Sequence, residues 1–203
     1  MSHWQEYYET TRDRAPDPIL EFACDRVSPS LPKVAVDCGC GAGRGVDLMR
    51  RRGFYVHAFD VEAEGVAVCR KRFAEDPEVR VSQAGFAEFD YPRASLVVAI
   101  NSLFFCSPGE FETGWGKIME SLIPGGIFFG TFVGPHDSWA DPGFVLEEAP
   151  DLKVLIHSEE KVRSLLSRHK FLALDIKDYD GVTALGSKKH WHLISVVATH
   201  AGS

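Results

Sequence analysis

The sequence lacks an apolar run long enough to cross a membrane, and its first residues, MSHWQEYYETTRDR, are too polar for a secretory signal peptide. We therefore expect a cytoplasmic protein. Cysteines are few and irregularly spaced, at positions 24, 38, 40, 69 and 106. An odd number without a regular framework indicates unlinked thiols in a reducing compartment.

An excess of positive charge is also missing. The 203 residues carry 22 Lys and Arg against 29 Asp and Glu, which gives a net charge of −7. This balance argues against a surface that follows nucleic acid phosphates, and we expect no nucleic acid or membrane partner. The sequence has no internal repeat and no low-complexity tract. Its length and its 45% hydrophobic content suit a single domain, residues 1–203, with its own core.

Apolar runs alternate with helical patterns along the chain. Strands are expected at 33–37, 55–60, 79–82, 95–101, 127–134, 173–178 and 192–199, and helices at 42–52, 63–73, 111–122 and after Ser158. The alternation predicts an α/β fold with a doubly wound, mostly parallel seven-stranded sheet, one late antiparallel strand, and helices on both faces.

Four segments follow from this pattern. Residues 33–133 form the cofactor-binding core, 1–32 a cap segment before it, 134–157 a loop or lid, and 158–203 a helix with a closing strand pair. Asp178 and Asp180 are expected in a solvated turn that precedes Gly181.

Glycines stand at every second position where the first strand ends, in VAVDCGCGAGRG, residues 34–45. Gly39, Gly41 and Gly43 let the backbone approach a ligand and turn sharply into a helix. Asp60, nineteen residues after Gly41, ends the second strand and can accept hydrogen bonds from two ribose hydroxyls. Together these features predict a cofactor that contains a nucleoside.

The third glycine of a dinucleotide fingerprint is missing, because it would fall on Arg44 or Val46 in the two possible registers. Asp37 precedes the first glycine by two residues. Its carboxylate would repel a pyrophosphate and attract an ammonium or a sulfonium. The pattern favours a cationic, phosphate-free nucleoside, and an NAD-dependent oxidoreductase is the less favoured alternative.

The run V-D-C-G-C-G-A-G-R resembles the glycine signature of class I S-adenosylmethionine-dependent methyltransferases, and Asp60 matches their acidic ribose ligand. LIPGGIFFGTF looks like the family's turn before the fifth strand. WQEYYETTRDRAPDP, FVGPHDSW and GSKKHWH are similar to the small, single-domain tellurite-resistance-type group. The resemblance covers nearly the whole chain. It implies a Rossmann-like fold, S-adenosyl-L-methionine as the cofactor, and methyl transfer as the activity.

The resemblance also implies which residues hold the methionine part of the cofactor. It places Tyr8 and Arg14 over the cofactor, where Arg14 would pair with the methionine carboxylate; a surface arginine is the alternative. Asn101 ends the fourth strand beside the methyl-transfer point. Its side-chain carbonyl would hold the cofactor ammonium, or it only caps the strand.

For adenine the chain departs from the family pattern. Many members carry an acid, which holds the adenine amino group, where this chain has Gly85. Adenine would instead be held by the backbone of Phe86, with Glu88 or another neighbour helping. Val61, after the ribose acid, is also expected to contact the cofactor.

Aromatic residues are expected to line the acceptor side. Phe104 and Phe105 would wall the sulfonium, where a cation–π contact contributes about 1 kcal/mol, or pack in the core. Trp139 would cover the site as a lid, or lie in an exposed connection.

The catalytic residue is not identified by any motif. His136 and His190 are the first candidates for a general base, if the acceptor needs one. His190 and His192 share a strand face, and Cys38 and Cys40 flank a glycine, but neither pair has further ligands at a suitable spacing. We therefore expect no metal.

The leading hypothesis is an S-adenosylmethionine-dependent methyltransferase that acts on a small-molecule acceptor by in-line displacement. Only the N-terminal segment and residues 134–150 are available to shape an acceptor site, which suits a small molecule better than a nucleic acid or a folded protein. The alternative is a non-catalytic protein that binds S-adenosylmethionine or S-adenosylhomocysteine.

Overall fold

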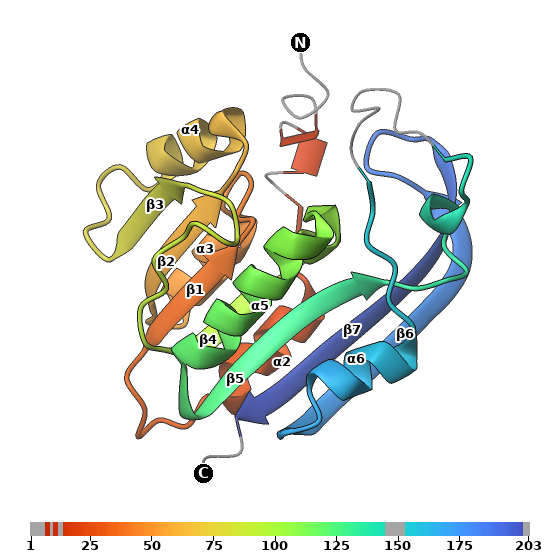
Figure 1. Ribbon diagram of the computed structural model, residues 1–203. Helices are drawn as coiled ribbons and strands as arrows, with labels where there is room; N and C mark the ends of the chain where they lie inside the picture. Colours follow the sequence, from red (N-terminus) through yellow and green to blue (C-terminus); the bar gives the residue numbers. More distant parts are fainter. Residues whose placement is uncertain (1–6, 9, 12–13, 145–152, 201–203) are drawn as a thin grey trace.

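The computed structural model describes residues 7–8, 10–11, 14–144 and 153–200. Its seven strands form one sheet in the order β3-β2-β1-β4-β5-β7-β6 (Figure 1). The strands are β1 (Val34–Cys38), β2 (Tyr55–Asp60), β3 (Val79–Gln83), β4 (Ala94–Ala99), β5 (Leu122–Val133), β6 (His169–Val182) and β7 (Lys188–His200). Only β7 runs antiparallel to its neighbours β5 and β6, so the expected sheet is confirmed.

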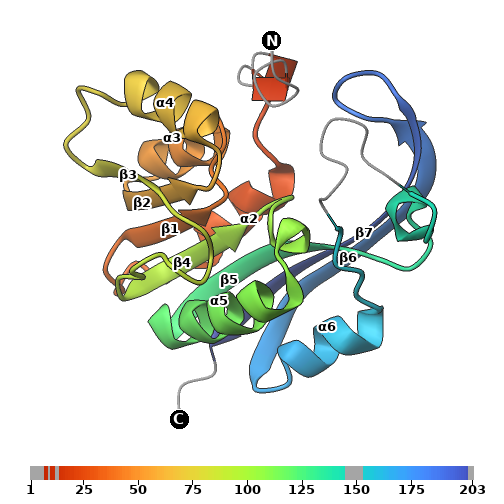
Figure 2. The same ribbon diagram turned by 45° about the horizontal axis from the view of Figure 1, so that its top comes forward.

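Helices cover both faces of the sheet (Figure 2). They are α2 (Pro18–Arg26), α3 (Arg44–Arg51), α4 (Ala63–Arg72), α5 (Pro108–Ser121) and α6 (Glu159–Leu165). One hydrophobic cluster joins α5 and α6 to one sheet face, through Trp115, Ile118 and Val162. A second joins α2, α3 and α4 to the other face, through Leu20 and Met49 among others. The doubly wound arrangement is therefore confirmed.

Several boundaries differ from the prediction. Helix α2 lies in what was expected to be a cap segment; Asp17 caps it by accepting the N–H of Ile19 at 2.8 Å, and Pro18 stands at its first turn. Strand β5 starts at Leu122 and runs through the Pro-Gly-Gly sequence that was expected to be a turn, with a register irregularity against β4.

The β6–β7 hairpin is longer than expected and corrects one prediction. Asp178 and Asp180 do not lie in a turn before Gly181 but within β6, paired with His192 and His190 of β7. Hairpin pairing continues to Val182, which faces Lys188 across the two strands. The longer hairpin carries side chains beyond the end of β5.

The order of strands decides where a ligand can bind. On one side of β1 the sheet continues with β2 and then β3, and on the other side with β4 and then β5. The carboxyl ends of β1 and β4 therefore diverge at a topological switch point, where open α/β sheets bind ligands.

The five cysteines are all unlinked and buried. Among the described residues, no helix is both long and apolar enough to span a bilayer.

Candidate functional site

The glycine turn follows β1 directly and takes the conformation that its sequence predicts. Gly39, Gly41 and Gly43 have φ values of +77°, +50° and +79°. Other residues rarely adopt this left-handed region. The amides of Gly39 and Cys40 donate to the carbonyl of Phe59 at 2.8 and 2.9 Å, which fastens the turn to the end of β2. The turn thus leads the chain into α3 with its backbone bare.

Asp60 is the side chain that closes this turn from β2. Its Oδ2 accepts the N–H of Gly41 at 2.8 Å and its Oδ1 accepts the N–H of Glu62 at 2.9 Å. The carboxyl is only 8% exposed, and burial raises its pKa above the ordinary value. Asp60 and the glycines are therefore brought together as the sequence predicts.

Asp37 lies beneath the turn rather than in it. The carboxyl is 4% exposed, it accepts the backbone N–H of Val46 in the first turn of α3, and its Oδ2 has no hydrogen-bond partner. A side chain on Gly45 would lie only 2.7 Å from this oxygen. Burial, and secondarily the charge of Asp60, raises the pKa of Asp37 to about 7.

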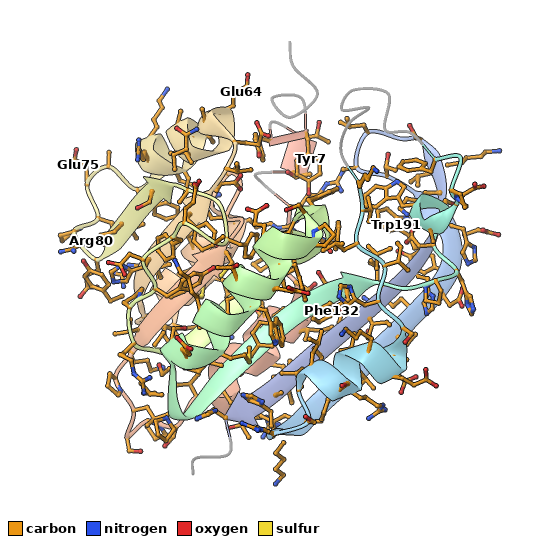
Figure 3. All side chains as sticks on the ribbon, viewed as in Figure 1. Tyr7, Glu64, Glu75, Arg80, Phe132 and Trp191 are labelled. Atoms are coloured by element: carbon orange, nitrogen blue, oxygen red, sulfur yellow. The ribbon has the colours of Figure 1, made fainter. Side chains whose placement is uncertain are left out.

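Within the N-terminal segment, Tyr8 lies against the glycine turn; Figure 3 labels its neighbour Tyr7. Tyr8 is 4% exposed, and its ring would lie 3.1 Å from a Cβ on Gly41 and 2.9 Å from one on Gly65. Burial first, and then Asp60, raises the pKa of Tyr8. Arg14 is exposed and donates to the carbonyl of Ala184, at 3.2 Å, in the turn of the β6–β7 hairpin. Tyr8 is thus at the turn, whereas Arg14 joins this segment to the hairpin.

An open surface pocket of about 490 Å³ begins at Val61, the residue after Asp60. Its lining residues are Val61, Gly85, Ala87, Glu88, Gly109 and Glu110. Gly85 and Glu88 lie at the position where the sequence predicts adenine, and Val61 is a predicted cofactor contact. Glu110 was not anticipated, because it comes from the first turn of α5, far from the others in sequence.

Glu110 stands where a side chain at position 85 would project. Its Oε1 accepts the N–H of Phe86 at 3.2 Å, and it would lie only 2.7 Å from a Cβ on Gly85. Glycine at position 85, where many family members have an acid, therefore leaves room for the carboxylate of Glu110, which comes from another element.

Asn101 follows β4 at the switch point with φ of +53°, the only described residue other than glycine with positive φ. Its amide donates to Oγ1 of Thr131 at 2.5 Å, and its Oδ1 accepts from the same hydroxyl at 3.1 Å. Ser102 beside it donates to the carbonyl of Cys38 at 2.7 Å. Two neighbouring strand ends are thereby tied together, and Asn101 is left exposed.

The aromatic residues expected on the acceptor side form one cluster. Phe104 and Phe105 have ring centroids 4.6 Å apart, and Trp139 lies 5.9 and 5.8 Å from them. Trp191 of β7, labelled in Figure 3, extends the cluster from Trp139 at 5.7 Å. Phe104 itself is only 3% exposed, so it is a core residue as well as a member of this cluster.

A buried ion pair holds the cluster. The ammonium of Lys189 lies 3.9 Å from the ring centroid of Trp139 and 4.4 Å from that of Trp191, and it pairs with the carboxylate of Asp137. Asp137 also accepts the backbone N–H groups of Trp139 and His192, both at 2.9 Å. In the segment that was expected to be a loop or lid, Asp137 and Ser138 are therefore fastened to β7. The sequence offered no sign of this pair, which joins residues fifty-two positions apart.

The two candidate bases lie elsewhere, His190 on β7 and His136 in the turn after β5. Residues of a strand alternate between the two sheet faces, so His190 projects opposite to Lys189 and Trp191. His136 lies with it, because its Nδ1 and His190 Nε2 contact the two oxygens of Asp178 at 2.8 and 2.7 Å. The structure does not bring these two histidines to the aromatic cluster.

Comparison with known proteins identifies the domain. The parallel sheet, the switch point and the bare turn closed by an acid define a Rossmann-like fold. Residues 35–126 match the sequence model of a family described as "Methyltransferase domain". These residues resemble the S-adenosylmethionine-dependent methyltransferases, whose cofactor is S-adenosyl-L-methionine.

Two similar proteins are the probable S-adenosylmethionine-dependent methyltransferases MT3114 and Rv3030, from two strains of Mycobacterium tuberculosis. Each is 39% identical over 66 residues, which are 32% of this chain. The match spans 23% of the length of those relatives.

Solved structures share the fold over almost the whole chain. TehB from Haemophilus influenzae has a TM-score of 0.72 at 14% identity, over 97% of this chain and 66% of TehB. A methyltransferase from Methanosarcina mazei has a TM-score of 0.71 at 14% identity, over 94% of this chain and 100% of that one. The magnesium protoporphyrin IX methyltransferase ChlM from Synechocystis has a TM-score of 0.62 at 11% identity, over 97% and 79%. The likeness to the tellurite-resistance type thus holds for the fold.

Proposed function

We propose that this chain transfers the methyl group of S-adenosylmethionine to a small-molecule acceptor. The observation that carries the proposal is the continuity of the site. Asp60 closes the glycine turn through Gly41, and the cavity with Glu110 opens directly beyond it at Val61. A ribose acid with an adjoining cavity for a base is what a nucleoside needs.

The residues of the chain fit the parts of the cofactor. Asp60 would accept the ribose hydroxyls. In the cavity, Glu110 would accept the exocyclic amine of adenine, and the amide of Phe86 would be released from Glu110 to donate to a ring nitrogen. The buried carboxyl of Asp37, with one unpartnered oxygen, would supply negative potential below the turn in its ionised form. Asn101, exposed at the end of β4, would hold the ammonium through its Oδ1.

Bound S-adenosylmethionine supplies an electrophilic methyl group on a positively charged sulfur. The contribution of the chain is alignment of the acceptor and exclusion of water, which together can account for much of the acceleration. The cluster of Phe104, Phe105, Trp139 and Trp191 would form the acceptor-side wall. Because His190 projects from the other face of the hairpin and His136 contacts Asp178 on that same face, we assign general-base catalysis to neither.

A small-molecule acceptor agrees with the names of proteins that share the fold. Their titles describe methyltransferases for geranyl diphosphate, magnesium protoporphyrin IX and a glycopeptide. In this chain the aromatic cluster is apolar, and its one cation, Lys189, is already paired with Asp137. We therefore propose that the acceptor presents an apolar or aromatic surface to it.

Calorimetric titration with S-adenosylmethionine and with NAD, followed by labelled methyl transfer to an acceptor panel, tests the proposal. We expect tight binding of S-adenosylmethionine only. In Asp60→Ala its affinity should fall by about 1–3 kcal/mol, roughly 5- to 150-fold, because charged hydrogen bonds are lost. Glu75→Ala, an exposed acid at a distance from the site, is the control. Tight binding without transfer to any acceptor would favour the non-catalytic alternative, and unchanged affinity in Asp60→Ala would refute the site.

A further inference from the structure

Five titratable side chains gather on the hairpin face opposite Trp191. In the register of the two strands Asp178 pairs with His192 and Asp180 with His190, so the four side chains project from one face. His136 joins them from the turn after β5, with its Nδ1 at 2.8 Å from Asp178 Oδ2. The spacing within β7 alone places two histidines on this face. The pairing with β6 adds the two aspartates, and the turn after β5 adds the third histidine.

Three of these side chains have the chemistry and the proximity of a metal site. His136, Asp178 and His192 each offer one ligand atom, and these atoms lie within 4.8 Å of one another. Imidazole nitrogens with a carboxylate oxygen suit Zn²⁺ and related ions, with bonds of about 2.0–2.2 Å. Tetrahedral ligands at such distances are about 3.4 Å apart. The side chains of His136 and Asp178 are 65% and 42% exposed, so they have room to close around an ion.

The remaining two side chains support the carboxylate. Asp178 Oδ1 lies 2.7 Å from His190 Nε2, and His190 Nδ1 lies 2.7 Å from Asp180 Oδ1. A chain of this kind, in which each group orients the next, is typical of the groups behind metal ligands. It fixes Asp178 Oδ1 and leaves Oδ2 directed toward His136.

One contact must be exchanged on binding. His192 is 8% exposed, and its Nδ1 accepts the amide N–H of His136 at 3.0 Å. If the His192 ring turns toward an ion, the backbone N–H of His136, which lies in an exposed turn, donates to water instead.

We propose that His136, Asp178 and His192 bind one divalent transition-metal ion, with Zn²⁺ as the reference ion, and that His190 and Asp180 position the Asp178 carboxylate. The ion would link the turn after β5 to the hairpin. Asp137, the next residue, anchors Trp139 and Lys189, so the ion would stiffen the aromatic cluster from behind without touching it.

The test is calorimetry with Zn²⁺ on the full chain, without an affinity tag, and visible absorption with Co²⁺ in its place. We expect one ion per chain and a Co²⁺ spectrum with nitrogen and oxygen ligands. His136→Ala and Asp178→Asn should each lower the affinity at least tenfold, and Asp180→Asn roughly 10- to 100-fold by loosening the support. Binding of S-adenosylmethionine, measured on the same variants, reports that they are folded and should not change.

His169→Ala is the matched control, because His169 lies 3.4 Å from His200 at the other end of the same hairpin and offers only a histidine pair. It should bind Zn²⁺ like the unaltered chain. Equal loss in this variant, or unaltered Zn²⁺ binding in both His136→Ala and Asp178→Asn, would overturn the proposal. Either result would leave the proposed methyl transfer untouched, since Asp60 and the cavity lie outside this cluster.

Discussion

Replacement of Asp37 by asparagine should make the free energy of unfolding fall less steeply as the pH rises. The same replacement should weaken cofactor binding. The carboxyl is buried, one of its oxygens has no partner, and its pKa in the folded protein is about 7 instead of the ordinary 3.8. Asparagine keeps the size of the side chain and the acceptor for the Val46 N–H. It removes the charge.

The sign of the effect follows from the proton inventory. Between pH 4 and 7 the folded protein retains a proton on Asp37 that the unfolded chain has lost, so the free energy of unfolding falls as the pH rises. A difference of about 3 pKa units corresponds to about 4 kcal/mol in total. Between pH 5 and 8 about 2–3 kcal/mol of this is lost. An asparagine side chain cannot ionise, so the variant escapes that loss.

The assay is urea denaturation of both proteins at pH values from 5 to 8, in the absence of cofactor. All other titrating groups are shared, so the difference between the two free energies of unfolding isolates Asp37. It should shift by about 2–3 kcal/mol in favour of the variant across this range. Parallel profiles would refute the reasoning, because they would mean that Asp37 is already ionised in the free protein.

The affinity for the cofactor should rise with pH, whereas the free energy of unfolding falls. A bound sulfonium or ammonium favours the ionised carboxyl, so the affinity of the unaltered chain for S-adenosylmethionine should rise as the pH passes through about 7, with release of a proton. Calorimetry in two buffers of different ionisation enthalpy measures that proton. The asparagine variant should release none and bind more weakly at pH 8.

The other predictions concern single contacts. Glu110→Gln should weaken S-adenosylmethionine binding by about 1.5–3 kcal/mol. It should also reduce the ratio of affinities for the adenine cofactor and a hypoxanthine analogue, measured by competition titration. An unchanged ratio would exclude Glu110 from the base site. Lys189→Met should lower the free energy of unfolding by about 3–5 kcal/mol, because the buried carboxylate of Asp137 loses its positively charged partner. Adding Asp137→Asn to this variant should restore part of the lost stability. Gly43→Ala should destabilise more than Gly53→Ala: both have φ near +80°, but only at Gly43 would the new Cβ meet Phe73 and Cys69, at 2.7 and 2.8 Å. Equal losses in urea denaturation would contradict this.

Much of the fold could be predicted because its signals are local. Alternating apolar runs and helical patterns predicted seven strands and the late antiparallel strand, and β2 was predicted to the residue. Helix α2 was missed although Asp17 and Pro18 are ordinary start signals. The extent of the hairpin was underestimated, since pairing between two long strands sustains polar stretches that by themselves resemble turns.

The candidate site divides along the same line. Asp60 and the glycines could be predicted because a bare turn after a strand and an acid at the end of the next strand are adjacent in any parallel sheet of this order. Glu110 could not, since nothing in α5 reveals that its first turn will face Gly85.

By itself, the sequence determined which backbone could bend sharply, which segments would be strands, and which acid would lie beside the bend. These depend on φ preferences and on periodicity within a few residues. Only the tertiary structure decided that Asp37 is buried under the turn, that Glu110 takes the space left by Gly85, and that three histidines and two aspartates share one hairpin face. Those depend on packing between distant elements, and a side chain's charge state and partners are set by its surroundings in space rather than by its neighbours in the chain.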